Sequence, residues 1–162
     1  MALDIEAVGL DGVYFRHVPR GAAPLVGPEP PRDGRWQRGE IVGAVYLADS
    51  VATAWAEWYR YLAEAALPPQ PSLPRDLWRW EISLSSVADL RHRGRLACVG
   101  LPAIQPTRLQ WPAFQSVGEQ LHQDGWPGSS ARRLRVRRVA RCVCFALLAR
   151  SPARNRYRRP QR

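Results

Sequence analysis

Leu77-Trp-Arg-Trp-Glu-Ile-Ser-Leu84 alternates strictly between apolar and polar side chains. Because successive side chains of a β-strand point to opposite faces, this pattern predicts a strand with one face buried. A similar alternation over residues 12–18 predicts a first strand near the N-terminus. The β-branched run of residues 41–47 predicts a buried strand between these two. We therefore expect a sheet whose strands come from separate parts of the chain.

Two helices are expected between and after these strands. Asp49-Ser50 supplies an N-cap, and apolar side chains follow at helical spacing to about Leu67, where Pro68-Pro-Gln-Pro71 ends the helix. A shorter helix is expected over residues 115–123, closed by Asp124-Gly125. Strands and short helices alternate irregularly, which favours the α+β class over a doubly wound sheet. We predict a single compact domain with a mixed sheet and short helices.

The charge of the chain is unevenly distributed. Its 162 residues carry a net charge of +10, and every positive side chain is an Arg. Twelve Arg and no acid lie in residues 132–162, so residues 1–131 have a net charge of −2. We therefore predict a domain over residues 1–131 and an Arg-rich tail over residues 132–162, either foreign to the domain or a basic extension of it. Within that tail, residues 141–145 are the candidate for a last strand.

Several classes of protein do not fit the sequence. The longest apolar run, residues 142–149, is far shorter than the roughly 20 residues of a membrane-spanning helix. No secretory signal is visible, and three cysteines do not form a disulfide framework, so we expect a cytoplasmic protein without membrane contact. The histidines have no metal-ligand spacing, and there is neither a Gly-rich phosphate loop nor a Gly-x-Ser-x-Gly elbow. We expect no metal site.

Four short motifs follow one another in the first third of the chain. They are Tyr14-Phe-Arg16, Gly34-Arg-Trp36, Val45-Tyr-Leu-Ala-Asp-Ser50 and Ala54-Trp-Ala-Glu57. The second motif ends a Pro- and Gly-rich loop of residues 19–39, and loops of that length in compact domains are usually functional or mobile. This order resembles the RES domain, a family named for its recurring Arg, Glu and Ser. The later Trp111-Pro-Ala-Phe-Gln-Ser-Val-Gly118 looks like the family's approach to its serine, so the resemblance spans residues 14–130.

The resemblance implies an enzyme that consumes NAD by hydrolysis or phosphorolysis of the nicotinamide–ribose bond. It also implies a fold similar to that of ADP-ribosyltransferases. Many members of the family are toxins held by an Xre-type helix-turn-helix antitoxin. The expected partners are therefore NAD, as a substrate and not a cofactor, and such an antitoxin. Contact with nucleic acid is then expected only through the antitoxin, and self-association stays open.

The resemblance also assigns candidate roles to residues. Breaking the bond develops oxocarbenium character on the ribose, and Glu57 is the carboxylate expected to stabilise that cation. Arg16 suits the NAD diphosphate, whose oxygens accept a forked guanidinium. Arg35 is either a second phosphate or ribose contact or a cation–π partner of the neighbouring Trp36. Tyr46 either stacks on the nicotinamide or adenine ring or is a core tyrosine.

The serine half of the site departs from the family pattern. The short apolar strand that usually precedes the serine is expected to be missing or displaced, because Gly128 is followed at once by Ser129-Ser-Ala-Arg132. Ser130 is the candidate for the family serine, with Ser129 next. Two other functions stay open: ADP-ribosyl transfer to a protein, and nucleic-acid binding by the basic tail.

Overall fold

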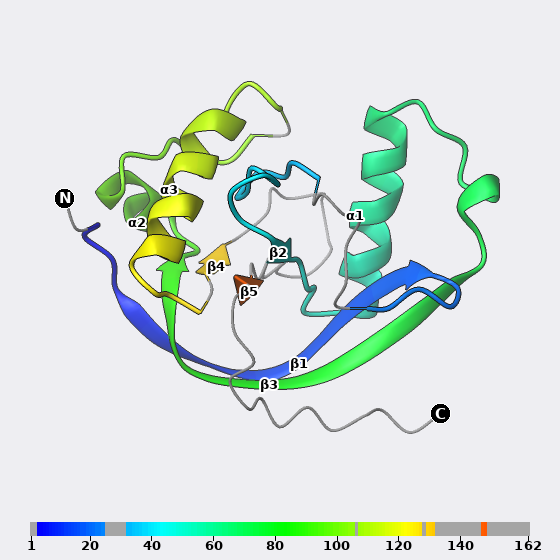
Figure 1. Ribbon diagram of the computed structural model, residues 1–162, viewed down its shortest axis with the longest axis horizontal. Coiled ribbons are helices and arrows are strands. Elements are labelled where there is room, and N and C mark those ends of the chain that lie inside the picture. Colours follow the sequence, from blue (N-terminus) through cyan, green and yellow to red (C-terminus); the bar gives the residue numbers. More distant parts are fainter. Residues whose placement is uncertain (1–2, 25–31, 106, 128, 132–146, 149–162) are drawn as a thin grey trace.

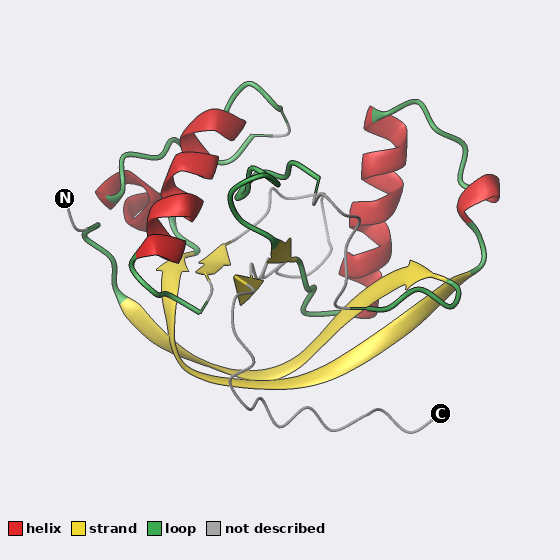
Figure 2. Cartoon of the chain, viewed as in Figure 1, coloured by secondary structure: helices red, strands yellow, loops and turns green. Residues whose placement is uncertain are grey.

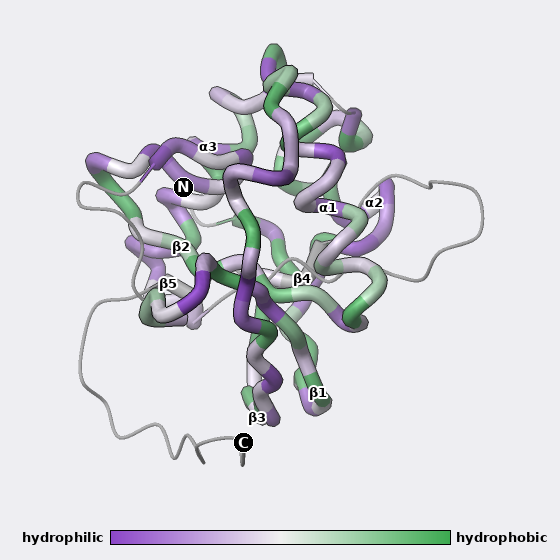
Figure 3. Tube along the Cα trace, turned by 90° about the vertical axis from the view of Figure 1, so that its right-hand side faces the viewer, coloured by the Kyte–Doolittle hydropathy of each residue, from purple (hydrophilic) through white to green (hydrophobic). Residues whose placement is uncertain are grey.

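Two long antiparallel strands, β1 (Ala7–Pro19) and β3 (Arg75–Leu90), frame the fold in the computed structural model. They form a ribbon bent into an arc (Figure 1), and apolar and polar residues alternate along much of it (Figure 3). Both strands predicted from alternation are therefore confirmed, and both are longer than predicted. The structure describes residues 3–24, 32–105, 107–127, 129–131 and 147–148, with the backbone alone at 130–131 and 147–148.

The sheet is mixed, as the sequence predicted. A three-residue strand, β4 (Ser129–Ala131), pairs in parallel with the end of β3, which gives the strand order β1-β3-β4. A separate pair of two-residue strands, β2 (Ala44–Val45) and β5 (Leu147–Leu148), is antiparallel and lies inside the arc (Figure 2).

The helices gather at the two ends of the arc. One end carries α1 (Val51–Glu64), and the other carries α2 (Arg93–Cys98) and α3 (Trp111–Gln123) (Figure 1). A short 3₁₀ helix, η1 (Gln70–Ser72), leads from α1 into β3. The segment that contains β2 lies between the two groups of helices. The α+β prediction is confirmed.

Two groups of buried apolar side chains form the core. One lies at the α2–α3 end and is built around Trp36, Leu90, Phe114 and Leu121. The other lies between the ribbon and β2 and comprises Tyr14, Val45, Leu47, Trp80, Ile82 and Val87. Arg16, a candidate site residue, lies two residues from Tyr14 of the second group, on the same face of β1.

The elements differ from the sequence analysis, or add to it, in three places. The strand expected over residues 41–47 contains only Ala44–Val45, although Val42, Leu47 and Ala48 are buried as a strand there would require. The strand expected to be missing before the candidate serine is replaced by β4, which contains the serines themselves. The six-residue α2 was not predicted, because it has no side-chain cap and is too short to show a periodic pattern. The strand predicted at residues 141–145 lies outside the described residues.

Within the part of the chain that the structure describes, none of the helices is both long and apolar enough to span a membrane.

Candidate active site

Arg16 lies in the middle of the β1–β3 ribbon, directly opposite Trp78. Its guanidinium is largely buried, and its Nη1 has no hydrogen-bond partner among the described residues. Burial lowers the pKa of Arg16, and the neighbouring guanidinium of Arg75 lowers it further. A buried charge without a counter-charge is unfavourable, and such groups concentrate at functional sites.

His17 joins β1 to the helix that carries Glu57. Its Nε2 lies 3.0 Å from the carbonyl oxygen of Ala54 in α1, and its ring stacks on Trp55 with 4.4 Å between ring centroids. Its Nδ1 accepts a hydrogen bond from Nε of Arg75 at 2.6 Å. Because Nδ1 accepts, Nε2 must be the protonated nitrogen, which donates to Ala54, so the imidazole is neutral. His17 thus fixes the first turns of α1 against the strand that carries Arg16.

The start of α1 is set by Ser50 rather than by Asp49. Ser50 is the N-cap, and its hydroxyl accepts a hydrogen bond from the backbone N–H of Thr53 at 3.1 Å. Backbone hydrogen bonds between Phe15 and Ala48, at 2.7 and 2.8 Å, bring the preceding segment alongside β1. Asp49 is therefore free of the capping role, and its buried Oδ1 has no hydrogen-bond partner among the described residues.

Asp49 lies close enough to Tyr14 to act on it electrostatically. Burial raises the pKa of Tyr14, and the carboxylate of Asp49 raises it further. Tyr14 and Arg16 are two residues apart on β1 and therefore share a face.

Glu57 lies in the second turn of α1 and is partly buried. It comes three residues after Ala54, whose carbonyl is held by His17, while Arg16 is the residue before His17. The structure therefore docks the element that carries Glu57 directly onto the element that carries Arg16. This is the pair of residues that the sequence placed at the centre of the site.

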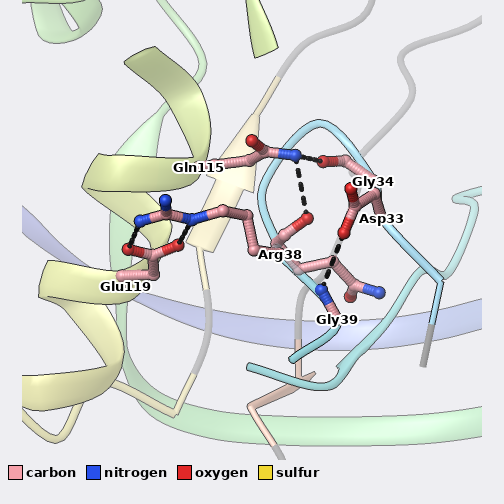
Figure 4. Close-up of polar contacts among 7 residues, drawn as sticks. Asp33, Gly34, Arg38, Gly39, Gln115 and Glu119 are labelled. Carbon is pink, nitrogen blue, oxygen red and sulfur yellow. Dashed lines mark hydrogen bonds and ion pairs between the residues drawn. The ribbon is translucent and has the colours of Figure 1, made fainter. Parts of the chain in front are cut away.

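A tight turn of residues 33–39 is fixed on one face of α3 (Figure 4). Arg38 forms a two-point ion pair with Glu119, with both nitrogen–oxygen distances at 2.5 Å. Gln115 donates from Nε2 to the carbonyl oxygens of Gly34 and Gln37 at 2.9 and 3.1 Å. Between these two residues, Gly118 allows the backbone of the turn to approach the helix closely. These contacts come from positions i, i+3 and i+4 of α3, which lie on one side of a helix.

Arg35 and Tyr46 are held by this turn and its surroundings. Arg35 is 8% exposed, its Nη2 donates to the carbonyl oxygen of Gln105 at 2.8 Å, and its guanidinium lies 5.4 Å from the ring centroid of Phe114. The ring beneath Arg35 thus comes from α3, whereas the sequence suggested Trp36. The hydroxyl of Tyr46 accepts a hydrogen bond from the backbone N–H of Trp36 at 3.2 Å. Both residues therefore make contacts within the protein, and whether either also binds a ligand stays a prediction.

Comparisons with known proteins identify the family of the chain. The model of the RES domain family matches residues 13–162, which is nearly the whole chain and includes its Arg-rich segment. The chain belongs to the RES domain family. No curated protein matches it. Among solved structures, a chain from the crystal structure of the M. tuberculosis MbcT–MbcA toxin–antitoxin complex is similar in fold. The TM-score is 0.72 at 21% sequence identity, over 94% of this chain and 84% of the other.

In this RES domain, the candidate serine lies at the opposite end of β3 from Trp78. The backbone of Ser130 pairs with Asp89, and Ser129 beside it is buried. Asp89 is bound by Arg91 through both carboxylate oxygens, at 2.8 and 3.0 Å, and these hydrogen bonds lower the pKa of Asp89. The positive charge of Arg91 partly offsets the rise in the pKa of Tyr14.

Two further residues near the candidate site, Trp78 and Asp49, were not among the candidates from the sequence. Trp78 was taken only as an apolar strand position, and its Nε1 is buried without a hydrogen-bond partner among the described residues. Asp49 was assigned to the helix cap. No sequence pattern signals either one, because both depend on which atoms remain unpaired after folding. The described part of the chain holds no group of three or more His, Cys, Asp or Glu that could bind a metal ion.

Proposed function

We propose that this RES domain protein is an NAD-consuming toxin that cleaves the nicotinamide–ribose bond. The observation that carries the proposal is the family match, because it covers the ordered set of Arg16, Tyr46 and Glu57 on which the NAD chemistry was inferred. In support, a buried guanidinium nitrogen of Arg16 has no hydrogen-bond partner among the described residues, and α1, the helix of Glu57, packs against the strand of Arg16.

In the proposed reaction, Arg16 binds the diphosphate of NAD and Glu57 lies near the ribose. As the bond between nicotinamide and the ribose C1′ breaks, the bonding electrons leave with the neutral nicotinamide and the ribose becomes an oxocarbenium ion. The carboxylate of Glu57 stabilises that positive charge, which is a large effect in a site with little water. Water or phosphate then adds to C1′ and completes hydrolysis or phosphorolysis. NAD is the substrate, and no further cofactor takes part.

The remaining candidate residues have supporting roles in this proposal. Arg35 anchors the turn of residues 33–39, since its contacts with Gln105 and Phe114 leave little of it exposed. Tyr46 holds the same turn through its hydroxyl and presents its ring to the nicotinamide or adenine. Ser130 is the family serine, on the parallel strand beside Asp89.

We also propose that an antitoxin protein of the Xre helix-turn-helix type binds this protein in the cytoplasm. The fold is similar to a chain of a toxin–antitoxin complex, which supports a partner of this kind. Co-expression with the protein encoded by a neighbouring gene, followed by co-purification, tests this part of the proposal.

The direct test compares nicotinamide release from NAD by the wild-type protein and by Glu57→Ala. The matched control is Glu64→Ala, on the same helix, where the glutamate pairs with Arg60 near the surface. We expect a loss of about a hundredfold or more in Glu57→Ala and a rate close to wild type in Glu64→Ala. Equal rates in all three proteins would reject the role of Glu57.

A further inference from the structure

The β1–β3 ribbon carries two buried N–H donors that find no acceptor in the part of the chain that the structure describes. They are Nη1 of Arg16 and Nε1 of Trp78, and neither has a hydrogen-bond partner among the described residues. The strand register places Arg16 and Trp78 directly opposite each other. Opposite residues of an antiparallel pair project from the same face, with Cβ atoms roughly 4.5–5.5 Å apart. The two donors therefore belong to one small patch.

An unpaired donor is unusual in a folded protein, because the great majority of buried polar groups are hydrogen-bonded. Here two occur side by side, and one of them carries a full positive charge. The guanidinium of Arg75 adds to the positive potential, and its own contacts are made with His17 and the face of the Trp58 ring. A ligand for this patch must accept hydrogen bonds from both donors and carry negative charge to match Arg16 and Arg75. An anion with several acceptor oxygens, such as a phosphate or diphosphate, meets these requirements.

Trp78 is also held in a fixed orientation. Its ring stacks on Trp80 with 6.2 Å between centroids and 21° between planes, and it packs against the core group that contains Tyr14 and Val45. Packing alone would be served by any large apolar ring, so the indole N–H is the feature that packing leaves unexplained. Both Arg16 and Trp78 keep part of their surface exposed, although the two donor atoms themselves are buried.

We propose that Trp78 is a further binding residue of this site, whose indole N–H donates to the same anionic group as the guanidinium of Arg16. This inference rests on the proposed function, in which that group is the diphosphate of NAD. Arg16 supplies charge, and Trp78 supplies a neutral donor at a fixed position, which orients the diphosphate relative to the ribose. Preorganised donors of this kind need no rearrangement when the ligand binds.

The test is a calorimetric titration of the full chain with inorganic pyrophosphate at constant ionic strength. Trp78→Phe keeps an aromatic ring for Trp80 and removes only the N–H donor. The matched control is Trp111→Phe, at the start of α3. We expect pyrophosphate to bind the wild type and the control equally, and Trp78→Phe to bind about tenfold more weakly, as for the loss of one hydrogen bond to a charged group. Arg16→Gln should bind more weakly still.

A second measurement uses the unaltered protein, so that a folding defect in Trp78→Phe does not leave the question open. In the wild type, pyrophosphate should move the Trp78 indole N–H resonance downfield, as expected when that proton forms a hydrogen bond. An unmoved Trp78 resonance, or affinity in Trp78→Phe equal to that of the wild type, would overturn the inference. Failure to bind pyrophosphate at all would do the same.

The outcomes separate this inference from the proposed function. If the wild type releases nicotinamide but Trp78→Phe binds pyrophosphate as tightly as the wild type, the proposed function is supported and the inference about Trp78 is rejected. Pyrophosphate binding that depends on Trp78, without any cleavage of NAD, retains the anion site and removes the proposed reaction.

Discussion

His17 is the residue whose protonation state links the stability of the site to pH. Its Nδ1 faces the positively charged Arg75, and Arg16 is the other nearby cation; Trp55 and Trp58 enclose the ring. Burial lowers the pKa of His17 below its ordinary value of 6.5, and the two arginines lower it further. Protonation would place a proton on the nitrogen that accepts from Arg75 and would break that contact.

The direction of the pH effect follows from this lowered pKa. Between the folded-state pKa and 6.5, the unfolded chain binds a proton that the folded protein does not. The free energy of unfolding contributed by His17 is therefore fully present above pH 6.5 and declines as the pH falls below it. Denaturant unfolding of the wild type between pH 5 and 7.5 should show this decline, and His17→Phe should show a flatter dependence. If the free energy of unfolding changes with pH equally in the wild type and in His17→Phe, the imidazole of His17 is not held neutral by the fold.

At the residue scale, the roles of Arg16 and Glu57 stay predictions, and the structure adds that the two residues lie on adjoining elements. The role of Trp78 could not be predicted, because alternation identifies an apolar strand position and says nothing about whether an indole N–H finds a partner. The same limit applies to Asp49, since a side chain beside a helix start is indistinguishable in sequence from the cap itself.

At the scale of elements, the contact between α3 and the turn of residues 33–39 depends on a glycine. A Cβ on Gly118 would lie 2.0 Å from the carbonyl oxygen of Trp36, which is backbone and has little freedom to move. We expect Gly118→Ala to lower the free energy of unfolding by about 3 kcal/mol, at the upper end of the usual cost of overpacking. Thermal or denaturant unfolding measures this change.

Gly94→Ala is the matched control for that substitution. Gly94 also lies within a helix, α2, and a Cβ there would meet nothing within 4 Å. We expect no loss of stability, and a gain of up to about 1 kcal/mol, because alanine has the higher helix propensity. Equal losses in both variants would show that the close approach of α3 to the turn is not what makes Gly118 necessary.

The cap of α1 offers a second test at this scale. Ser50→Ala removes the hydroxyl that accepts from the N–H of Thr53, and losses of this kind are typically about 1 kcal/mol. We expect that decrease in the free energy of unfolding, together with slower NAD cleavage, because the first turns of α1 position Glu57. The exposed Ser116→Ala in α3 should leave both quantities unchanged. If Ser50→Ala is destabilised but cleaves NAD at the wild-type rate, the cap does not contribute to positioning Glu57.

Strands were predictable from the sequence where only one face is buried, and less predictable where both faces are buried. The alternation of residues 77–84 identified β3, but the strand continues to Leu90 through Val87 and Ala88, all of them buried, where alternation is lost. The opposite error occurred at residues 41–47. Val42, Val45 and Leu47 are buried there, yet only Ala44–Val45 pair with another strand, which comes from the far end of the chain. Pairing with so distant a segment has no local signal.

At the scale of the whole molecule, the boundary predicted between residues 131 and 132 stays a prediction. The pairing of β2 with β5 shows that the chain beyond this boundary reaches back to the centre of the arc. We expect deletion of residues 132–162 to lower the unfolding midpoint, because it removes β5 and leaves β2 unpaired. Deletion of residues 149–162, which keeps β5, is the control. Equal midpoints for both shortened chains and the full chain would favour a tail independent of the domain.

The central claim is that this arc-shaped RES domain breaks the nicotinamide–ribose bond of NAD. The most direct measurement is the mass of the products formed when the folded, full-length wild type is incubated with NAD and phosphate. The account predicts free nicotinamide together with ADP-ribose, if water is the acceptor, or phosphorylated ADP-ribose, if phosphate is. Intact NAD after prolonged incubation with folded protein would contradict it.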